Sequence, residues 1–541
     1  MAGLEDALSR YRRLADSFRW DLPDPFNFGR DVVDRWAERE PERPALFWRG
    51  ATGADRRLGF GEVSRGAHRV AQLLVSLGVR PGDPVLVMLP KLPEWQLAML
   101  GALEAGALVI PCSTVLRPKD VLYRAQHSGA VAIVATPEPA AAVDAVRREL
   151  TSVRHFLAYR SEGGALPDGW LDAAREAERA PDHAAGLPTT RASDPALVYY
   201  TSGTTGPPKA VLHAHAYTRA QRFTAEVWLG LRDGDRIWTT SDTGWAKAAY
   251  GVLFGPWNAG AEVFQWAGRF DPARELELLG EIAPQVFCAP PTEYRLLVKE
   301  DLSALRVPQL RECVSAGEPL NPEVIRAWRE ATGLTIRDGY GQTETILLVG
   351  NFPGLPVRPG SMGLPMPGHR VEVIGEDGGV LAPGEVGDVA LAGDPPSLFR
   401  GYWKDSAATD RCRRGEWYVT GDRAYKDADG YFWFVGRADD VIISAGYRIG
   451  PFEVESALVE HPAVVEAAAV AAPDPDRGAI VKAFVVLRPG VRGDAALVKE
   501  LQDHVKRVTA PYKYPRAVEF VESLPKTVSG KIRRVDLRGK R

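Results

Sequence analysis

Short apolar runs alternate with amphipathic segments of helical length in the first part of the chain. Between residues 62 and 77, Val63, Val70 and Leu74 recur at helical spacing, and the apolar run 85–89 follows a Pro-Gly-Asp turn. The pattern predicts helices at 62–77, 94–105 and 119–127 and strands at 85–89, 107–112 and 130–135. Strands that alternate with helices predict a parallel sheet with crossover helices.

The same alternation returns after residue 195, which indicates a second unit of the same kind. It predicts strands at 196–200, 236–240, 261–266, 285–289, 310–315 and 335–337, with helices between them. The intervening stretch 137–193 is rich in Ala, Pro and charged residues, and we expect it to run along the surface. Short β-rich segments with Pro-Gly-Glu and Asp-Gly turns predict an antiparallel β region over 371–393. We therefore expect two similar α/β units packed together, plus a β region.

The pattern changes again near Gly436. A helix that starts at a proline is expected at 451–459, a strand at 481–487, a helix at 495–508 and a strand at 518–521. These elements predict a small, mobile α+β C-terminal domain over 437–541, joined to a large N-terminal domain over 1–436. We place the hinge near Asp439, because the two carboxylates of Asp439 and Asp440 between apolar strands suit an exposed joint.

Composition narrows the class of protein. A chain of 541 residues, 45% apolar and 25% charged, is typical of a soluble globular protein with more than one domain. A net charge of −3 gives no basic surface for nucleic acid, and no apolar run is long enough to span a bilayer. The four cysteines form no C-x-x-C pair and indicate a reducing compartment. Acidic residues near the N-terminus fit neither a secretory signal nor a transit peptide, so we predict a cytoplasmic protein.

A loop with the chemistry of a phosphate site follows the predicted strand 196–200. It reads Tyr199-Tyr-Thr-Ser-Gly-Thr-Thr-Gly-Pro-Pro-Lys209. Glycines let backbone N–H groups approach an anion, hydroxyl groups add donors, and the lysine adds a positive charge. The loop differs from the G-x-x-x-x-G-K-[ST] pattern, since Lys209 follows a proline. A mobile linker is the alternative, which the preceding strand and the Pro-Pro-Lys end argue against.

Six further polar stretches stand out, and three of them follow predicted strands. They are Asp242-Thr-Gly-Trp245, Ala316-Gly-Glu-Pro319, Asp338-Gly-Tyr-Gly-Gln-Thr-Glu344, Thr420-Gly-Asp422, Gly436-Arg437 through Tyr447-Arg448, and Pro525-Lys-Thr-Val-Ser-Gly-Lys531. In open α/β sheets, ligands bind beyond the carboxyl ends of the strands, so these loops are expected to line one site. His213 and His215 resemble a metal-binding pair, but no third ligand is evident and we predict no metal there.

The seven stretches, in this order, resemble the core motifs of the adenylate-forming superfamily of acyl-CoA synthetases, adenylation domains and luciferases. The resemblance runs from about residue 26 to the end of the chain. Phe26-Asn-Phe28, Ser241-Asp-Thr-Gly-Trp245 and Ala510-Pro-Tyr-Lys-Tyr-Pro-Arg516 are similar to the medium-chain acyl-CoA synthetases. Ala445 departs from these relatives, which often carry serine at this position.

The resemblance implies a role for each motif residue toward ATP, Mg²⁺, coenzyme A and a small carboxylic acid. Thr201, Ser202, Gly203, Thr204, Thr205, Gly206, Pro207, Pro208 and Lys209 would close over the β- and γ-phosphates, and Gly317, Glu318, Pro319, Asp338, Gly339, Tyr340, Gly341 and Gln342 would line the nucleotide site, mainly around the adenine. Thr343 would touch the α-phosphate, Glu344 would ligate Mg²⁺, Asp422 and Arg437 would hold the ribose, and Lys531 would reach the α-phosphate and the acyl carboxylate. Gly446, Tyr447, Arg448, Arg477, Lys506, Tyr514, Pro515 and Arg516 would line the CoA path, with Asp439 as the hinge.

The acid is expected to bind next to Trp245, Lys247, Tyr250 and Gly251, and a buried Lys247 would favour short to medium or compact acids. The implied reaction couples a carboxylate to AMP with loss of pyrophosphate and then passes the acyl group to CoA. Lys531, Thr343, Glu344 and Lys209 would be its catalytic residues. Two alternatives remain: transfer to a carrier-protein pantetheine, or a non-catalytic nucleotide-binding protein. The sequence predicts neither the exact acid nor the oligomeric state.

Overall fold

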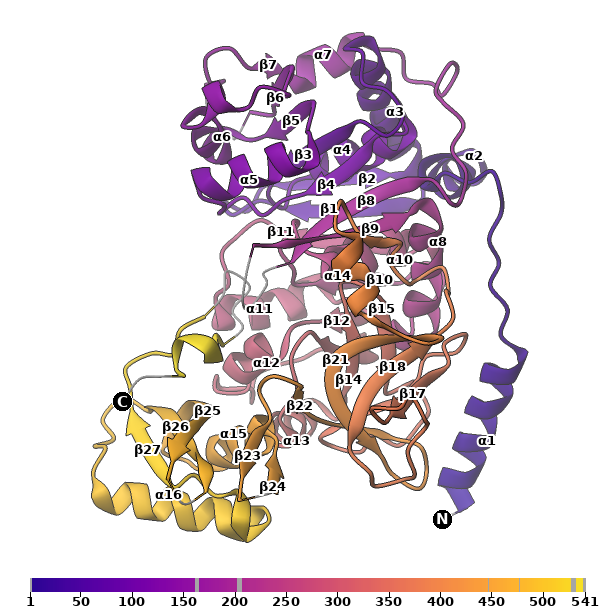
Figure 1. Cartoon of the computed structure of the whole chain (residues 1–541). Helices are drawn as coiled ribbons and strands as arrows, with labels where there is room; N and C mark the ends of the chain where they lie inside the picture. The colour runs from indigo at the N-terminus through magenta and orange to yellow at the C-terminus, as the bar shows by residue number, and fades with distance from the viewer. Residues whose placement is uncertain are drawn as a thin grey trace.

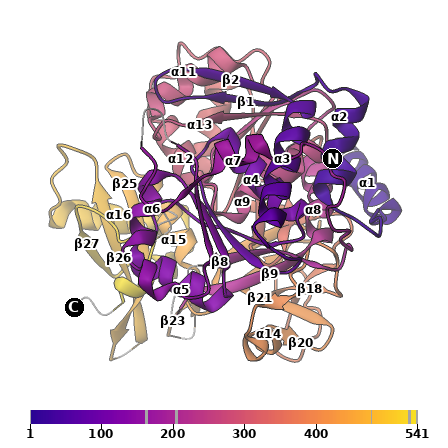
Figure 2. The same ribbon diagram turned by 90° about the horizontal axis from the view of Figure 1, so that it is seen from above.

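The computed structural model describes residues 2–160, 165–201, 207–445, 447–475, 477–526 and 532–538. Two α/β units, each built on its own sheet, lie one above the other in Figure 1, and the small C-terminal domain (yellow) lies at the side of the second unit. Figure 2, seen from above, again shows the C-terminal domain at one side of the two units. The predicted α/β class and the predicted large and small parts are therefore confirmed.

The first unit is an eight-stranded sheet whose central strands are parallel. Its order is β19 (Gly401–Tyr402), β9 (Lys209–Ala214), β8 (Pro195–Thr201), β4 (Leu108–Pro111), β3 (Pro84–Met88), β5 (Ala132–Ala135), β6 (His155–Ala158) and β7 (Leu171–Asp172). Its helices are α3 (Phe60–Ser76), α4 (Pro93–Glu104), α5 (Pro118–Ser128), α6 (Pro137–Asp144) and α7 (Ala173–Arg179), with a short 3₁₀ turn at Arg147–Glu149. The strands β3, β4 and β5 are buried along their whole length, as expected of a sheet covered on both faces.

The stretch 137–193 does not simply run along the surface. Strand β6 pairs in parallel with β5, opposite Ile133 and Val134, and its last two residues are buried. Leu157 and Ala158 supply the apolar contact that extends the sheet. The expectation of a surface segment failed because a strand of four residues is enough to extend the sheet. So short an apolar run is hard to recognise between charged flanking segments.

The second unit is a fourteen-stranded sheet that also contains the predicted β region. Its order is β17 (Val371–Ile374), β18 (Gly387–Ala392), β21 (Trp417–Lys426), β22 (Phe432–Arg437), β16 (Ser361–Pro365), β15 (Ile346–Gly350), β14 (Ile336–Gln342), β13 (Glu312–Ala316), β12 (Val286–Cys288), β10 (Arg236–Thr239), β11 (Glu262–Trp266), β1 (Pro44–Arg49) and β2 (Asp55–Gly59), with β20 (Arg413–Arg414) beside β21. The strands β17 and β18 pair antiparallel, as predicted for 371–393, and β21 and β22, which were not predicted, continue the antiparallel pairing. They continue from the parallel strands through β15 and β16 and do not form a separate layer.

Helices of the second unit cover this sheet and join it to the first. They are α8 (His215–Phe223), α9 (Ala246–Ala248), α10 (Phe254–Asn258), α11 (Pro272–Ile282), α12 (Pro291–Leu297), α13 (Pro322–Thr332) and α14 (Ser406–Arg411), with π-helical turns at Thr224–Leu229 and Ala249–Leu253. Proline stands in the first turn of α11, α12 and α13, where its missing N–H leaves no hydrogen bond unmade.

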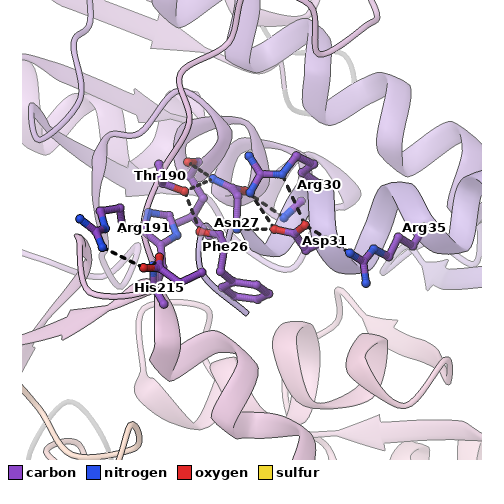
Figure 3. A network of polar contacts seen from close by, with 12 residues as sticks. Phe26, Asn27, Arg30, Asp31, Arg35, Thr190, Arg191 and His215 are labelled. Carbon is purple, nitrogen blue, oxygen red and sulfur yellow. Dashed lines mark hydrogen bonds and ion pairs between the residues drawn. The ribbon is translucent and has the colours of Figure 1, made fainter. Parts of the chain in front are cut away.

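The N-terminal segment runs along both units. It contains α1 (Ala2–Ser17), the π-helical turn η1 (Gly29–Asp34) and α2 (Arg35–Arg39). The Asn27 side chain donates to the Leu103 carbonyl at 2.8 Å and to Thr190 Oγ1 at 3.2 Å, and the Thr190 hydroxyl donates to the Phe26 carbonyl (Figure 3). The Phe-Asn-Phe motif thus anchors this segment to the first unit.

The C-terminal domain packs two helices against a three-stranded sheet. It contains the hairpin β23 (Ile442–Ser444) and β24 (Tyr447–Ile449), then α15 (Pro451–Glu460), β25 (Val464–Asp474), β26 (Gly478–Leu487), α16 (Ala495–Val508) and β27 (Ala517–Phe520), with 3₁₀ turns at Pro511–Lys513 and Arg534–Asp536. The Asn321 side chain donates to Ser456 Oγ at 3.1 Å and links α15 to the second unit. Within the described ranges, no helix combines the length and the apolar character that crossing a membrane requires.

Candidate active site

One large cleft, with a volume of about 1280 Å³, lies where the two α/β units and the C-terminal domain meet. Most of the motif residues predicted from the sequence line it. They are Thr201, Pro207, Pro208, Lys209, Trp245, Lys247, Tyr250, Gly317, Glu318, Pro319, Asp338, Gly339, Tyr340, Gly341, Gln342, Thr343, Glu344, Asp422, Arg437 and Asp439. Residues 202–206, the centre of the predicted phosphate loop, lie outside the described residues, as do Gly446 and Lys531.

Tyr402 brings two predicted catalytic residues together at the end of the phosphate-loop strands. Strands β8 and β9 pair antiparallel up to Thr201 and Lys209, so both ends of the loop open into the cleft. Lys209 Nζ lies 4.8 Å from the centre of the Tyr402 ring, and the Tyr402 hydroxyl donates to Glu344 Oε1 at 2.8 Å. Burial raises the pKa of Glu344, while the Tyr402 hydroxyl and Lys209 act in the opposite direction. The ring therefore holds a cation and a carboxylate on the same side of the cleft.

A tight turn between β14 and β15 presents Thr343 and Glu344 to the cleft. Gln342 pairs with Ile346 across the turn, and the Gln342 N–H donates to Thr345 Oγ1 at 3.1 Å. Ile346 has a φ of 61°, a left-handed conformation that is strained for a β-branched residue. Strain of this kind is typical of functional turns, because the surrounding structure must enforce it.

His213 supports this turn from β9. Its Nε2 lies 2.8 Å from the carbonyl oxygen of Thr343, and its ring packs at 3.8 Å between centroids on Tyr217. Burial lowers the pKa of His213 to about 3 and that of His215 to about 4, so both rings are neutral at pH 7. The neutral His213 ring donates its Nε2–H to the Thr343 carbonyl. His213 is thus a positioning residue.

Asp422, on β21, accepts hydrogen bonds from two side chains of β14. The Tyr340 hydroxyl donates to Asp422 Oδ2 at 2.6 Å, and Gln342 Nε2 donates to the same oxygen at 2.7 Å. The Tyr418 hydroxyl in turn donates to Gln342 Oε1 at 3.0 Å and fixes the amide orientation. Asp422 is 7% exposed, so its carboxylate is aimed into the cleft by three side chains.

The loops after β13 and within β14 form an adjoining wall of the cleft. Gly317 has a φ of 109°, which a residue with a side chain rarely adopts, and the following Glu318 side chain accepts from Thr292 Oγ1 at 2.9 Å. Burial raises the pKa of Asp338 to about 8, so this carboxyl group is mostly protonated at pH 7. A protonated carboxyl offers one donor and acceptor capacity, as recognition of a heterocycle edge requires.

The expected acyl wall contains a half-buried lysine. Trp245 and Lys247 line the cleft at the start of α9, and Tyr250 lines it from the π-helical turn Ala249–Leu253. Lys247 Nζ is shielded from solvent and makes no hydrogen bond to any described residue. Gly251 does not line the cleft; it packs against Thr239, where an added Cβ would lie 2.5 Å from the threonine methyl group. Its predicted contact with the substrate is therefore replaced by a packing role.

Of the site residues predicted in the C-terminal domain, only Arg437 and Asp439 line the cleft among those that the structure describes. Ile532, Arg533 and Arg534, which follow Lys531, line it together with Glu455. The described residues predicted for CoA do not line the cleft. Tyr447 stacks on Tyr512 with ring centroids 4.4 Å apart, and Lys506 Nζ and Arg516 lie over the ring of Tyr514, the residue before Pro515. The Arg477 carbonyl accepts a hydrogen bond from the Ala445 N–H. Only the backbone of Arg448 is described, in β24.

The predicted hinge lies at the entrance of the cleft. Arg437, opposite Asp422 in the pairing of β21 with β22, lies with its Nε 3.6 Å from Asp439 Oδ1. Both side chains are about half exposed. Ala445 has a φ of 49° in the turn between β23 and β24.

Sequence reasoning missed Tyr402, His213 and Tyr418. No local motif surrounds Tyr402, and its partner Glu344 is 58 positions away in the sequence. For His213 a signal existed, because it lies on β9, the strand that follows the phosphate loop, close in sequence to Lys209. The positioning role itself could not be predicted, because it depends on a contact across 130 positions.

Comparison with known proteins places this geometry in a family. The model described as AMP-binding enzyme matches residues 33–403, and that of the AMP-binding enzyme C-terminal domain matches residues 453–531. The chain is 45% identical to the Mus musculus protein named acyl-coenzyme A synthetase ACSM3, mitochondrial, over 98% of this chain and 93% of that protein. It is 44% identical to Homo sapiens acyl-coenzyme A synthetase ACSM4, mitochondrial, over 96% and 91% of the two chains.

Solved structures of CoA ligases share the fold of this chain. The anthranilate CoA ligase AuaEII in complex with anthranoyl-AMP superimposes with a TM-score of 0.87 at 31% identity, over 97% of this chain and 98% of that chain. A benzoate CoA ligase from Burkholderia xenovorans superimposes with a TM-score of 0.82 at 31% identity, over 95% and 100% of the chains.

The cytoplasmic prediction is wrong, because both of these mammalian relatives are named as mitochondrial. Four cysteines without a disulfide among them fit any reducing compartment, so they did not justify the narrower inference. The resemblance drawn from the motifs is confirmed over nearly the whole length. The chain belongs to the AMP-binding enzyme family and, within it, to the AMP-forming acyl-CoA synthetases.

Proposed function

We propose that this cleft activates a medium-chain, branched or small aromatic acid with ATP and passes the acyl group to CoA. The observation that carries the proposal is the convergence of Lys209, Glu344 and Asp422 with the aromatic wall of Trp245 and Tyr250 in one cleft. A cation and a carboxylate suit a metal-bound triphosphate, the second carboxylate suits ribose hydroxyls, and the aromatic wall suits an apolar acid.

The donor set fits a magnesium ion bound together with phosphates. Mg²⁺ is usually held by one or two carboxylates plus substrate phosphates, and Glu344 supplies one carboxylate, oriented by Tyr402. Such an ion would neutralise charge on the phosphate oxygens during transfer. The charge of a dication also compensates a carboxylate whose pKa burial has raised.

Each group then has one task in the first half-reaction. A carboxylate oxygen of the acid attacks the α-phosphorus, a bond to the acyl oxygen forms, and pyrophosphate leaves with the bonding electrons. From the resemblance of the motifs, Lys209 and its loop would hold the β- and γ-phosphates, Thr343 would contact the α-phosphate, and Lys531 would reach the same oxygens. Positioning and charge stabilisation supply most of the catalysis in such transfers, and no covalent enzyme nucleophile is needed.

The second half-reaction uses another face of the C-terminal domain. The CoA thiol loses its proton, attacks the acyl carbon and displaces AMP to form the thioester. In the described structure the residues after Lys531 face the cleft, whereas Tyr447, Lys506 and Arg516 do not. We therefore infer that the domain, residues 437–541, rotates at Asp439 between the two steps, as rigid domains do about short hinges.

The nature of the acid follows from the acyl wall. Burying an ammonium group against an alkyl chain is costly, so Lys247 restricts the depth that a chain can occupy. The solved neighbours are named as ligases of anthranilate and benzoate, which are compact aromatic acids. A compact aromatic, branched or medium-length acid fits this wall better than a long fatty acid.

The test is pyrophosphate release with ATP and a panel of acids from acetate to dodecanoate plus benzoate, each with and without CoA. We expect release to peak for medium or compact acids and thioester to appear only with free CoA. Acid-dependent release without thioester would instead support transfer to a carrier protein. ATP binding without turnover on any acid would refute the proposed reaction.

A further inference from the structure

Outside the cleft, η1 of the N-terminal segment and the helices α3 and α4 of the first unit bring Asp34, His68 and Glu104 together in the interior. Asp34 ends η1, His68 lies in α3 and Glu104 ends α4. One oxygen or nitrogen of each residue lies within 4.8 Å of those of the other two. None of the three lines the active-site cleft, and they take no part in the proposed reaction.

Glu104 is buried without a hydrogen-bond partner. It is 4% exposed, and neither carboxyl oxygen makes a hydrogen bond to any residue in the described part of the chain. Its Oε2 lies 3.9 Å from His68 Nε2. Its Oε1 faces Gly29, where an added Cβ would lie only 2.0 Å away. The absence of a side chain at Gly29 therefore leaves room for a carboxylate that is aimed at the histidine.

Asp34 and His68 each contact a second group that orients them, as metal ligands in proteins commonly do. His68 Nδ1 lies 3.2 Å from the Asp182 carbonyl oxygen, to which its N–H donates, so Nε2 is the ring nitrogen that a cation would take by displacing its proton. Ser64 Oγ donates to Asp34 Oδ1 at 2.7 Å, and Asp34 Oδ2 lies 3.0 Å from His68 Nε2. A backbone carbonyl behind the imidazole and a hydroxyl behind the carboxylate are the usual outer contacts of a metal site.

The separations also suit a small cation. Metal–ligand distances near 2.1 Å in a tetrahedral site put ligand atoms about 3.4 Å apart. The observed separations of 3.0 Å and 3.9 Å lie on either side of this value. One nitrogen and two carboxylate oxygens form a borderline set that suits divalent first-row cations such as Zn²⁺.

Charge balance points in the same direction. A cation would bind with the imidazole neutral and both carboxyl groups ionised, a set with a charge of −2 that one dication neutralises. The neighbouring Arg30 offsets only part of this charge, because its guanidinium is paired with Asp31 at 2.8 Å, as Figure 3 shows. Buried carboxylates are otherwise compensated by protons, one on the imidazole and one on Glu104, and that is the alternative to be excluded.

We propose that Asp34, His68 and Glu104 form a structural site for a divalent transition-metal cation, with water as the fourth ligand. The ion would join η1, α3 and α4, and with them the N-terminal segment, to the first unit. The site is separate from the magnesium ion that accompanies ATP and does not depend on the proposed reaction.

The experiment uses the full chain, stripped with a chelator and titrated with Co²⁺ in the presence of excess Mg²⁺ and without ATP. Co²⁺ in a low-symmetry nitrogen and oxygen site absorbs visible light more strongly than the hexahydrate. We expect one equivalent to bind with such a spectrum, Zn²⁺ to displace it, and Zn²⁺ to raise the thermal unfolding midpoint. Glu104→Gln and His68→Gln should each weaken binding by at least about tenfold.

Two matched controls separate this site from others. Glu275→Gln changes another buried glutamate, 2% exposed, and should leave the spectrum unchanged. His504→Gln tests adventitious binding by the His461–His504 pair near the surface and should also have no effect. A wild-type chain that binds no stoichiometric Co²⁺, or a Glu104→Gln variant that binds it as the wild type does, overturns the proposal. Because the wild-type spectrum is itself decisive, a misfolded variant cannot hide the result.

Discussion

Tyr402→Phe tests whether Glu344 works as a metal ligand. The substitution removes one hydroxyl group, which donates to Glu344 Oε1 at 2.8 Å, and keeps the ring over which Lys209 Nζ lies at 4.8 Å. The cation–ring contact therefore survives, because the face of phenylalanine carries the same negative charge distribution. Only the orientation and the charge stabilisation of the glutamate are lost.

Two independent arguments give the size of the effect. A hydrogen bond to a charged group is worth about 1.5–3 kcal/mol, which corresponds to about ten- to a hundredfold in an equilibrium or rate. Loss of an outer partner of a metal ligand typically costs about 10–100-fold in metal affinity or activity. We expect a loss in this range in adenylate formation at limiting Mg²⁺.

The pH dependence changes in a defined direction. Burial raises the pKa of Glu344 and the Tyr402 hydroxyl lowers it, so removal of the hydroxyl raises this pKa further. Only the carboxylate binds the cation, hence the acid limb of the rate profile should move to higher pH in Tyr402→Phe. If loss of the Tyr402 hydroxyl had only a structural effect, the rate would fall equally at all pH values.

The assay is acid-dependent pyrophosphate release, measured against Mg²⁺ concentration and against pH. Tyr431→Phe is the matched control, since its hydroxyl donates to the Pro356 carbonyl at 3.0 Å away from the cleft. It should leave both profiles unchanged. An unaltered Mg²⁺ dependence together with an unaltered acid limb in Tyr402→Phe would refute the assignment of Glu344 as the ligand.

Four further predictions follow from the same geometry. Asp422→Ala removes the acceptor of two donors and should weaken ATP binding about ten- to a hundredfold by calorimetry, whereas affinity within twofold of the parent would contradict its ribose role. Lys247→Ala should shift the acid preference to longer chains, and an unchanged chain-length profile would place Lys247 outside the acyl pocket. Asp338 holds a proton up to about pH 8 in the folded protein but only up to about pH 4 in the unfolded chain. Between these two pH values the folded protein therefore binds one more proton, and the free energy of unfolding should fall as pH rises, by up to about 1.4 kcal/mol per pH unit. Asp338→Asn should remove this slope in urea unfolding of the ligand-free protein, and equal slopes in both proteins would show that the carboxyl is ionised. Lys531→Ala should lose pyrophosphate release while still converting supplied acyl-AMP and CoA to thioester. Asp439→Pro, which stiffens the hinge, should still form acyl-AMP but transfer it slowly to CoA. Equal slowing of both steps by Lys531→Ala would contradict the use of different faces of the C-terminal domain in the two half-reactions.

Elements with a strong local signal could be predicted from the sequence. The helix predicted at 495–508 coincides with α16, because one face is apolar and Asp494 caps its start by accepting from the Leu497 N–H at 2.9 Å. The loops at strand ends were also predicted to share a site, since parallel strands in one sheet direct their carboxyl ends to one edge. This topological rule needs no knowledge of side-chain packing.

Contacts between distant segments could not be predicted in this way. Strand β1 pairs in parallel with β11, with Leu46 opposite Val263, and nothing in the local pattern encodes that partner. The long strand β25 is rich in alanine, a strong helix former, so its composition gives no strand signal. Tyr402 reaches Glu344 only because β19 is added to the edge of the first sheet beside β9.

Glu344 and Asp422, two of the acidic residues that line the cleft, are oriented in the same way. Each carboxylate receives a tyrosine hydroxyl, Glu344 from Tyr402 at 2.8 Å and Asp422 from Tyr340 at 2.6 Å. A neutral donor offsets only part of the cost of burying a negative charge, whereas a fixed lysine or arginine would offset more but would also compete with the ligand. Under the proposed function, Mg²⁺ bound with the triphosphate would add positive charge at Glu344 beside that of Lys209, and ribose hydroxyls would add neutral donors at Asp422. Nucleotide binding would then depend on the metal, while the two tyrosines keep both carboxylates oriented before it arrives.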